Sequence, residues 1–176
     1  MKDIWVTSDT HFGHSNILEY GPRPFNNIHQ HDQELLENWN SVVKPGDRVY
    51  HLGDVYMGCA GGYAWELLKR LHGKKHLLLG NHDDGKDAVL HKWFYKIGLW
   101  RTFGDEGLIF SHIPLHSSNL QTRKKKAILN VHGHIHGNPS PSNQYMNVCV
   151  EWTQYRPIHF DELLQRQRNY ENERST

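Results

Sequence analysis

Three apolar runs of this chain are each followed at once by a short polar turn, and this pattern limits the possible folds more than any other feature. The runs cover residues 3–8, 47–52 and 76–79, which we expect to be strands. The turns that follow them are Asp9-Thr10-His11, Gly53-Asp54 and Gly80-Asn81-His82-Asp83. In α/β sheets, ligands bind beyond the carboxyl ends of the strands. We therefore expect the three turns to meet at one edge of one sheet.

The segments between and after these runs predict helices first and strands later. Helices are expected over 28–43, over 63–71, and from Asp83 or Asp84 to Ile97. Further strands are expected over 100–103, 107–111, 127–131, 145–152 and 157–160. A last helix, capped by Asp161, is expected from 162 to about 170, with residues 171–176 frayed. This order predicts one α/β domain over 1–176 with an added mixed or antiparallel portion.

The composition excludes several classes of protein. The 176 residues include 20 basic and 19 acidic side chains, so the net charge of +1 gives no strong global field toward nucleic acid or membranes. No apolar run approaches the roughly 20 residues of a membrane span, and the first residues lack the apolar segment of a signal peptide. The two cysteines, Cys59 and Cys149, form no CxxC pair. We therefore expect a cytoplasmic protein.

Histidine is the residue in excess, with 15 copies, and several copies stand where a ligand site is expected. Two later strands are followed by Ser111-His112 and by Gly133-His134-Ile135-His136. Carboxylate, amide and imidazole donors together suit divalent Mn, Fe, Zn, Ni or Mg rather than a thiolate zinc site. These candidate ligands are more than one metal ion can bind. Two ions about 3.5–4 Å apart can hold a phosphoryl group between them during its displacement. His132 alternates with His134 and His136, so periodicity alone does not choose among the three.

The ordered set Asp-x-His, Gly-Asp, Gly-Asn-His-Asp, His and Gly-His-x-His resembles the calcineurin-like metallophosphoesterases. The resemblance extends from Asp9 to His136. The run from Ser8 to His14, followed by Arg23-Pro24-Phe25, is similar to a small branch common in bacteria and their phages. The resemblance implies an α/β fold of four layers, α/β/β/α, in which a β-sandwich is flanked by helices and carries metals at its edge.

The resemblance also implies a role for each donor. Asp9, His11 and His136 would hold the first metal, and Asn81, His112 and His134 the second, with Asp54 bridging the two. Manganese is the expected metal, and a hydroxide held by the metal pair would attack phosphorus. His82 would be the catalytic histidine, which stabilises or protonates the leaving oxygen. His132 is interpreted as a structural or supporting residue.

Two differences from the family pattern reduce the range of substrates that we expect. Met57 stands where the protein-phosphatase branch has an Asp that orients the catalytic histidine, and no large insertion supplies a cap. We therefore expect a small phosphoester, a nucleotide or a phosphodiester rather than a phosphoprotein. A metal-binding scaffold with little activity and a nuclease are the alternatives. The sequence does not predict the oligomeric state.

Two further features carry two interpretations each. His14 and Arg23 are candidate substrate contacts together with Asn81, because both lie near the first metal turn in sequence and Arg suits bidentate phosphate binding, but either residue could instead anchor a loop or form a surface salt bridge. The basic run Arg123-Lys124-Lys125-Lys126 is either a solvated loop or a lip that recruits nucleic acid. Cys149 is expected to be packed, and Cys59 to be an ordinary free thiol.

Overall fold

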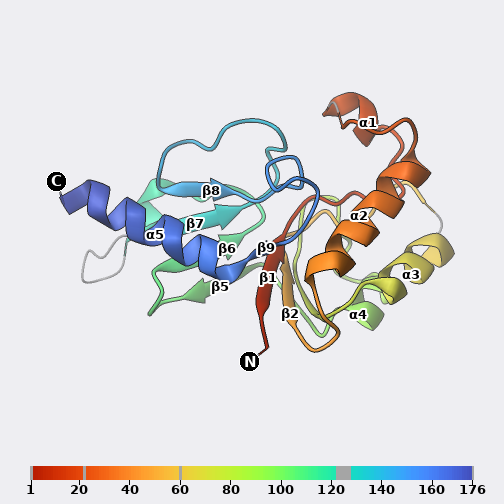
Figure 1. Cartoon of the computed structure of the whole chain (residues 1–176), viewed down its shortest axis with the longest axis horizontal. Coiled ribbons are helices and arrows are strands. Elements are labelled where there is room, and N and C mark those ends of the chain that lie inside the picture. Colours follow the sequence, from red (N-terminus) through yellow and green to blue (C-terminus); the bar gives the residue numbers. More distant parts are fainter. Residues whose placement is uncertain (1, 22, 60, 122–127, 176) are drawn as a thin grey trace.

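Two β-sheets flanked by helices make up this computed structural model, which describes residues 2–21, 23–59, 61–121 and 128–175 (Figure 1). The first sheet has the strand order β4-β3-β2-β1-β9 and the second has the order β5-β6-β7-β8. The strands are β1 (Ile4–Thr7), β2 (Arg48–His51), β3 (Lys74–Leu78), β4 (Lys96–Gly98), β5 (Trp100–Phe103), β6 (Leu108–Ser111), β7 (Leu129–His132), β8 (Tyr145–Asn147) and β9 (Ile158–His159). The helices are α1 (Ile17–Tyr20), α2 (Ile28–Val42), α3 (Gly61–Arg70), α4 (Ala88–Trp93), a short 3-10 turn over Ser117–Asn119, and α5 (Phe160–Ser175).

The direction of the strands determines where the polar turns lie. Strands β1 to β4 are parallel, and β9 runs antiparallel beside β1. In the second sheet, β6, β7 and β8 are parallel and β5 is antiparallel to β6. The carboxyl ends of β1, β2 and β3 therefore reach the same edge of the first sheet, as the sequence predicts.

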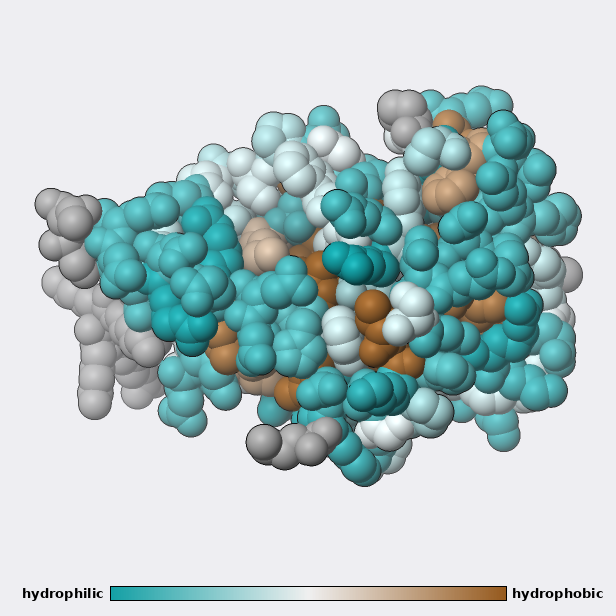
Figure 2. Space-filling model, in the orientation of Figure 1, coloured by the Kyte–Doolittle hydropathy of each residue, from teal (hydrophilic) through white to brown (hydrophobic). Residues whose placement is uncertain are grey.

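Two hydrophobic cores lie on the two faces of the first sheet. On one face, Trp39 of α2 and Leu68 of α3 pack with Leu77 of β3. On the other face, Val6 of β1 packs with Phe110 of the second sheet, and α5 joins this core while packing on β1, β7 and β9. The face of the molecule in Figure 2 is mostly hydrophilic, with hydrophobic residues in small, separate areas. None of the described helices is long and apolar enough to cross a membrane.

Most of the elements expected from periodicity are present. The helix expected over 28–43 is α2, and the strands expected over 100–103 and 107–111 are β5 and β6. The N-cap of α2 is Asn27, whose side chain accepts a hydrogen bond from the backbone of Gln30. Helix α1 is an additional element that the sequence does not predict.

The expected helix from Asp83 or Asp84 to Ile97 is wrong in both start and length. Helix α4 covers only Ala88–Trp93, and Asp87 is the residue that caps it. Asp83 is unavailable as a cap because its carboxylate already accepts hydrogen bonds from the backbone of the turn after β2 and from Gly80 in its own turn. Ile97 lies in β4, which pairs in parallel with β3 along the edge of the sheet. An edge strand of three residues is too short to show an alternating pattern of apolar and polar residues, so the sequence does not separate it from the preceding helix.

Two expectations near the end of the chain are also wrong. The strand expected over 145–152 ends at Asn147, because the side chain of Asn147 accepts the hydrogen bond of the Cys149 backbone and the chain then turns. The last helix begins at Phe160 rather than 162. His159 rather than Asp161 caps it, because Nδ1 of His159 accepts from the backbone of Asp161, and Glu162 accepts in return from the backbone of His159. It runs to Ser175 instead of fraying after 170, and buried Tyr170 holds these turns to the core.

Candidate metal centre

Five of the expected metal ligands have a backbone conformation that L-residues seldom adopt. Their φ angles are positive: Asp9 58°, His11 48°, Asp54 56°, His134 69° and His136 48°. A left-handed backbone costs free energy in residues other than glycine, and such conformations gather at functional sites where surrounding contacts impose them. The strained turns are therefore held in place by the rest of the fold.

Backbone hydrogen bonds hold the turns against one another. The backbone N–H of Asp9 donates to the carbonyl of Gly53 at 3.0 Å, and that of His11 donates to the carbonyl of Asp54 at 3.0 Å. The carboxylate of Asp83 accepts from the backbone N–H groups of Asp54 and Gly80, both at 2.8 Å. Asp83 thus ties the turn after β3 to the turn after β2.

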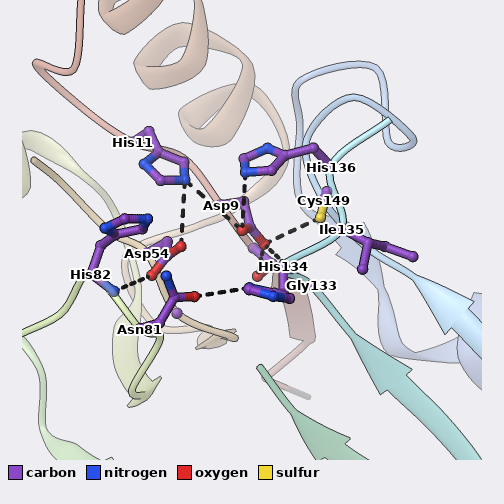
Figure 3. Close-up of polar contacts among 12 residues, drawn as sticks. Asp9, His11, Asp54, Asn81, His82, Gly133, His134, Ile135, His136 and Cys149 are labelled. Carbon is purple, nitrogen blue, oxygen red and sulfur yellow. Dashed lines mark hydrogen bonds and ion pairs between the residues drawn. The ribbon is translucent and has the colours of Figure 1, made fainter. Parts of the chain in front are cut away.

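Asp9, His11 and His136 form the first donor cluster, with one ligand atom from each lying within 4.8 Å of the others (Figure 3). Asp9 Oδ1 lies 4.0 Å from Nε2 of His11 and 3.9 Å from Nε2 of His136. Asp9 Oδ1 and His11 Nε2 are buried and have no hydrogen-bond partner among the described residues. Burial, followed by the positive charge of Arg23, strongly lowers the pKa of His11, so its ring is neutral and able to bind a cation.

The second oxygen of Asp9 is fully engaged by the protein. Asp9 Oδ2 accepts hydrogen bonds from the Ser8 hydroxyl, from the His134 backbone at 2.9 Å and from the Cys149 thiol at 3.2 Å. Burial raises the pKa of Cys149, which keeps the sulfur protonated as a donor. This arrangement turns Oδ1, the free oxygen, toward the two histidines. Cys149 is buried as expected, and its contact with Asp9 is an addition to that expectation.

Asp54, His112 and His134 form the second cluster, and Asp54 also faces the first. Asp54 Oδ2 lies 3.5 Å from Nε2 of His11 and 3.5 Å from Nε2 of His112. Its other oxygen accepts a hydrogen bond from the His82 backbone at 2.9 Å. One carboxylate oxygen thus lies between the two clusters. Two neighbouring groups of oxygen and imidazole donors with a shared carboxylate fit a pair of divalent ions.

Asn81 completes the second cluster with an amide oxygen. Its Oδ1 lies 2.9 Å from Nε2 of His112 and 2.8 Å from Nδ1 of His134. Nδ1 of His112 donates to the carbonyl of Leu52 at 2.8 Å, so Nε2 is the ring nitrogen that faces the cluster. All seven donors expected from the sequence therefore lie together.

Glu151 is a residue of this centre that sequence reasoning missed. Its Oε1 accepts from Nδ1 of His136 at 3.0 Å, and this bond orients the ring so that Nε2 faces Asp9. The same oxygen accepts from Nε and Nη2 of Arg23 at 3.0 and 2.8 Å. The sequence placed Glu151 in a strand, whereas it lies in the turn after β8. A carboxylate 15 positions from His136 gives no local signal of this contact.

Arg23 lies behind the centre rather than at its surface. Only 4% of the residue is exposed, and its guanidinium donates to the backbone carbonyls of Asp9 at 2.7 Å and Thr10 at 3.1 Å. The expected substrate contact is therefore not supported, and the loop-anchor interpretation describes this placement. The reason is that the planar group fills a buried space between the first turn and Glu151.

Of the remaining candidate residues, His14 and His82 lie beside the first cluster, and His132 does not. The ring centroids of His82 and His14 lie 5.6 and 5.4 Å from that of His11, and His82 is exposed. His132 is buried with its Nε2 3.1 Å from the Ser140 hydroxyl, and it belongs to neither donor cluster. The basic run from Arg123 to Lys126 lies outside the described residues.

Comparisons with known proteins agree with this geometry. The profile of the calcineurin-like phosphoesterase family matches residues 2–175. An uncharacterised protein of Methanocaldococcus jannaschii is 30% identical over 93% of this chain and 90% of its own length. The gene 66 protein of Mycobacterium phage L5 is 38% identical, over 47% of this chain and 41% of its own. The crystal structure of a protein of unknown function from Aquifex aeolicus superposes with a TM-score of 0.75 and 28% identity, covering 93% of this chain and 98% of that one.

Proposed function

The chain belongs to the calcineurin-like phosphoesterase family, and from that premise we propose that it hydrolyses phosphodiester or nucleotide-type phosphoester bonds at a centre for two divalent metal ions. The observation that supports this most strongly is the position of Asp54, whose Oδ2 lies 3.5 Å from a histidine of each donor cluster. A carboxylate in that position can be shared by two ions, and such pairs are used for in-line phosphoryl displacement.

The side chains divide the work of holding the metals. Asp9, His11 and His136 would bind one ion, and the second cluster with Asn81 would bind the other. When bound, such a pair of ions supplies an activated water as nucleophile and neutralises charge on the phosphate oxygens. Manganese is the ion that we propose first, because oxygen and neutral imidazole donors without thiolate suit it.

His82 is the residue that we assign to proton transfer. Its backbone N–H holds Asp54, and its exposed ring lies at the open side of the first cluster. An imidazole in that place can donate a proton to the leaving oxygen of a bound phosphoester, which is general-acid catalysis. Asn81 and His14 lie on the same open side, where they can contact phosphate oxygens.

The test is hydrolysis of a chromogenic phosphodiester and a chromogenic monoester by the purified chain with added Mn²⁺. Asp54→Asn should abolish turnover because it removes the shared charge. His82→Gln should lower kcat by about 10²–10⁴-fold. Lys69→Gln, at an exposed ion pair with Glu66 on α3, is the matched control and should leave the rate unchanged.

Metal binding is measured alongside turnover by competition with a chromophoric chelator. A chain that binds two equivalents of Mn²⁺ but hydrolyses neither ester would contradict the proposal and favour a scaffold.

A further inference from the structure

A cleft lined by basic residues extends along β3 and β4, starting at the ends of these strands that lie opposite the metal turns. It has a volume of about 440 Å³ and contains the side chains of Arg48, Lys74, His76, Lys96 and Arg101. None of the described residues that line it is acidic. Arg48, Lys74 and Lys96 are the first residues of β2, β3 and β4, so these basic side chains lie at the amino ends of the strands, and the cleft extends along β3 and β4 as far as Leu78 and Gly98. The metal donors follow the carboxyl ends of β2 and β3.

The register of the sheet places these charges on one face. Arg48 pairs with Lys74, and His76 pairs with Lys96. Side chains two residues apart on a strand point to the same side, so Lys74 and His76 share this face. Burial first, and then the positive charges of the four neighbouring Lys and Arg side chains, lower the pKa of His76 to about 4. Its Nε2 is buried without a hydrogen-bond partner among the described residues. A concave site with this charge favours an anionic ligand.

Trp100 connects the basic cleft to the metal centre. Its side chain is 64% exposed and lines the basic cleft together with Arg101. It also lines an adjoining, mostly apolar cleft of about 660 Å³, whose other walls include the expected metal ligands Asn81 and His112. The two clefts therefore adjoin at Trp100, and we refer to them together as the groove, with the basic residues on one side of the exposed indole ring and the metal donors on the other.

The length of this groove selects for a chain rather than a single nucleotide. A strand rises about 3.3 Å per residue, so the four steps from Lys74 to Leu78 span roughly 13 Å. Asn81 lies three positions beyond Leu78. A ligand that contacts both the basic cleft and the metal donors must therefore extend over several linked phosphates. Basic residues that follow a phosphate backbone, combined with an aromatic ring on which bases stack, are the features of single-strand binding sites.

We propose that this groove binds single-stranded nucleic acid, with one phosphodiester of the strand at the metal centre. The inference rests on the proposed function, because it names the substrate of the same centre. Hydrolysis there adds water across one P–O ester bond, so that one fragment keeps the phosphate and the other leaves with a hydroxyl group. The apolar cleft next to the donors accommodates the bases that flank this bond.

Binding is tested without catalysis, by fluorescence anisotropy of a labelled single-stranded oligonucleotide in EDTA. The double variant Lys74→Gln with Lys96→Gln should weaken binding roughly tenfold and reduce the slope of log affinity against log salt by about two, because two phosphate contacts are lost. Trp100→Ala should weaken binding roughly tenfold with little change in the salt slope, because stacking is lost. Lys69→Gln removes one positive charge from an exposed ion pair on α3, outside the lining of both clefts, and should bind like the wild type.

The outcomes separate this inference from the proposed function. If the wild type hydrolyses the small diester but does not bind the oligonucleotide at low salt, the groove does not bind nucleic acid and the phosphoesterase remains. If the oligonucleotide binds but no ester is hydrolysed, the proposed phosphoesterase function is wrong, while the inference that the groove binds nucleic acid still holds. Inorganic phosphate or a mononucleotide that competes as strongly as the oligonucleotide would overturn the requirement for a chain. An affinity unchanged in both groove variants would also overturn the inference.

Discussion

At the scale of single residues, the orientation of the metal-donor side chains is fixed by hydrogen bonds that each side chain makes away from the centre. His112 is fixed by the carbonyl of Leu52, His136 by Glu151, and one oxygen of Asp9 by the thiol of Cys149. Each of these bonds decides which atom of the side chain faces the cluster. Such supporting contacts are typically worth a factor of about 10–100 in metal affinity.

Glu151 gives the sharpest test of this support. Glu151→Ala should lower Mn²⁺ affinity about 10–100-fold, because His136 loses the acceptor that orients its ring. Glu151→Gln, which keeps an acceptor oxygen without the charge, should recover part of this loss. Affinity is measured by chelator competition, with Glu66→Ala as the control at an exposed ion pair. Equal affinity of Glu151→Ala and the wild type would show that His136 is oriented by other contacts.

The sequence predicted the donors of this centre better than their supports. Asp9, Asp54 and Asn81 were identifiable because each follows an apolar run directly, and parallel strands bring such positions together. Glu151 and the buried role of Arg23 depend on contacts across 128 positions, for which local spacing contains no information. The same limit explains why a phosphate contact was expected of Arg23.

At the scale of elements, the turns are shaped by close contact between segments. A Cβ atom added at Gly133 would overlap the side chains of Ser8 and Asp9, whereas one added at Gly137 would meet nothing within 4 Å. The absence of a side chain at Gly133 therefore allows the turn after β7 to approach the turn after β1.

Gly133→Ala should consequently destabilise the protein by about 1–3 kcal/mol, the usual cost of overpacking. It should also weaken Mn²⁺ binding, because Asp9 must move. Gly137→Ala, four positions away in the same segment, is the matched control with little expected effect. Urea titrations of both variants and the wild type measure the free energy of unfolding. Equal stability of the two variants would mean that the turn relaxes at no cost.

Elements with a long amphipathic pattern could be predicted, and short ones could not. Helix α2 buries Leu35, Leu36 and Trp39 on one stripe, which gives a clear period. Strand β4 has three residues and exists because it pairs with β3, while β8 stops where the Asn147 side chain engages its own backbone. These ends are decided by tertiary hydrogen bonds rather than by the local pattern.

At the scale of the whole molecule, buried neutral histidines make stability depend on pH. His51 is buried with its Nε2 2.9 Å from the Thr10 hydroxyl, and the Gly53 backbone donates to its Nδ1. Burial first, and the neighbouring His112 second, lower the pKa of His51 to about 3. The unfolded chain takes up this proton near its ordinary pKa of about 6.5, whereas the folded chain does not. The stability from neutral His51 is therefore complete above about pH 6.5 and is lost as the pH falls toward 3.

This linkage predicts that the free energy of unfolding changes less steeply with pH in a His51 variant than in the wild type. Between about pH 6 and pH 4, His51 should contribute about 1.4 kcal/mol per pH unit to the fall in the free energy of unfolding. His51→Gln removes the titrating group, so its slope should be smaller by that amount. Urea titrations across this interval measure both slopes. Parallel curves for the two proteins would show that His51 is not neutral in the folded state.

The pairing of β1 with β9 has a consequence for synthesis on the ribosome. Trp5 and Val6 pair with His159 and Ile158, and the thiol that holds Asp9 comes 140 positions after it. At about 5–20 residues per second, the nascent chain needs roughly 7–28 seconds to cover that interval. Asp9 and His11 can meet the turn after β2 earlier, but His136 and Cys149 reach them only near the end of this time. The first cluster is thus among the last parts of the newborn protein to assemble.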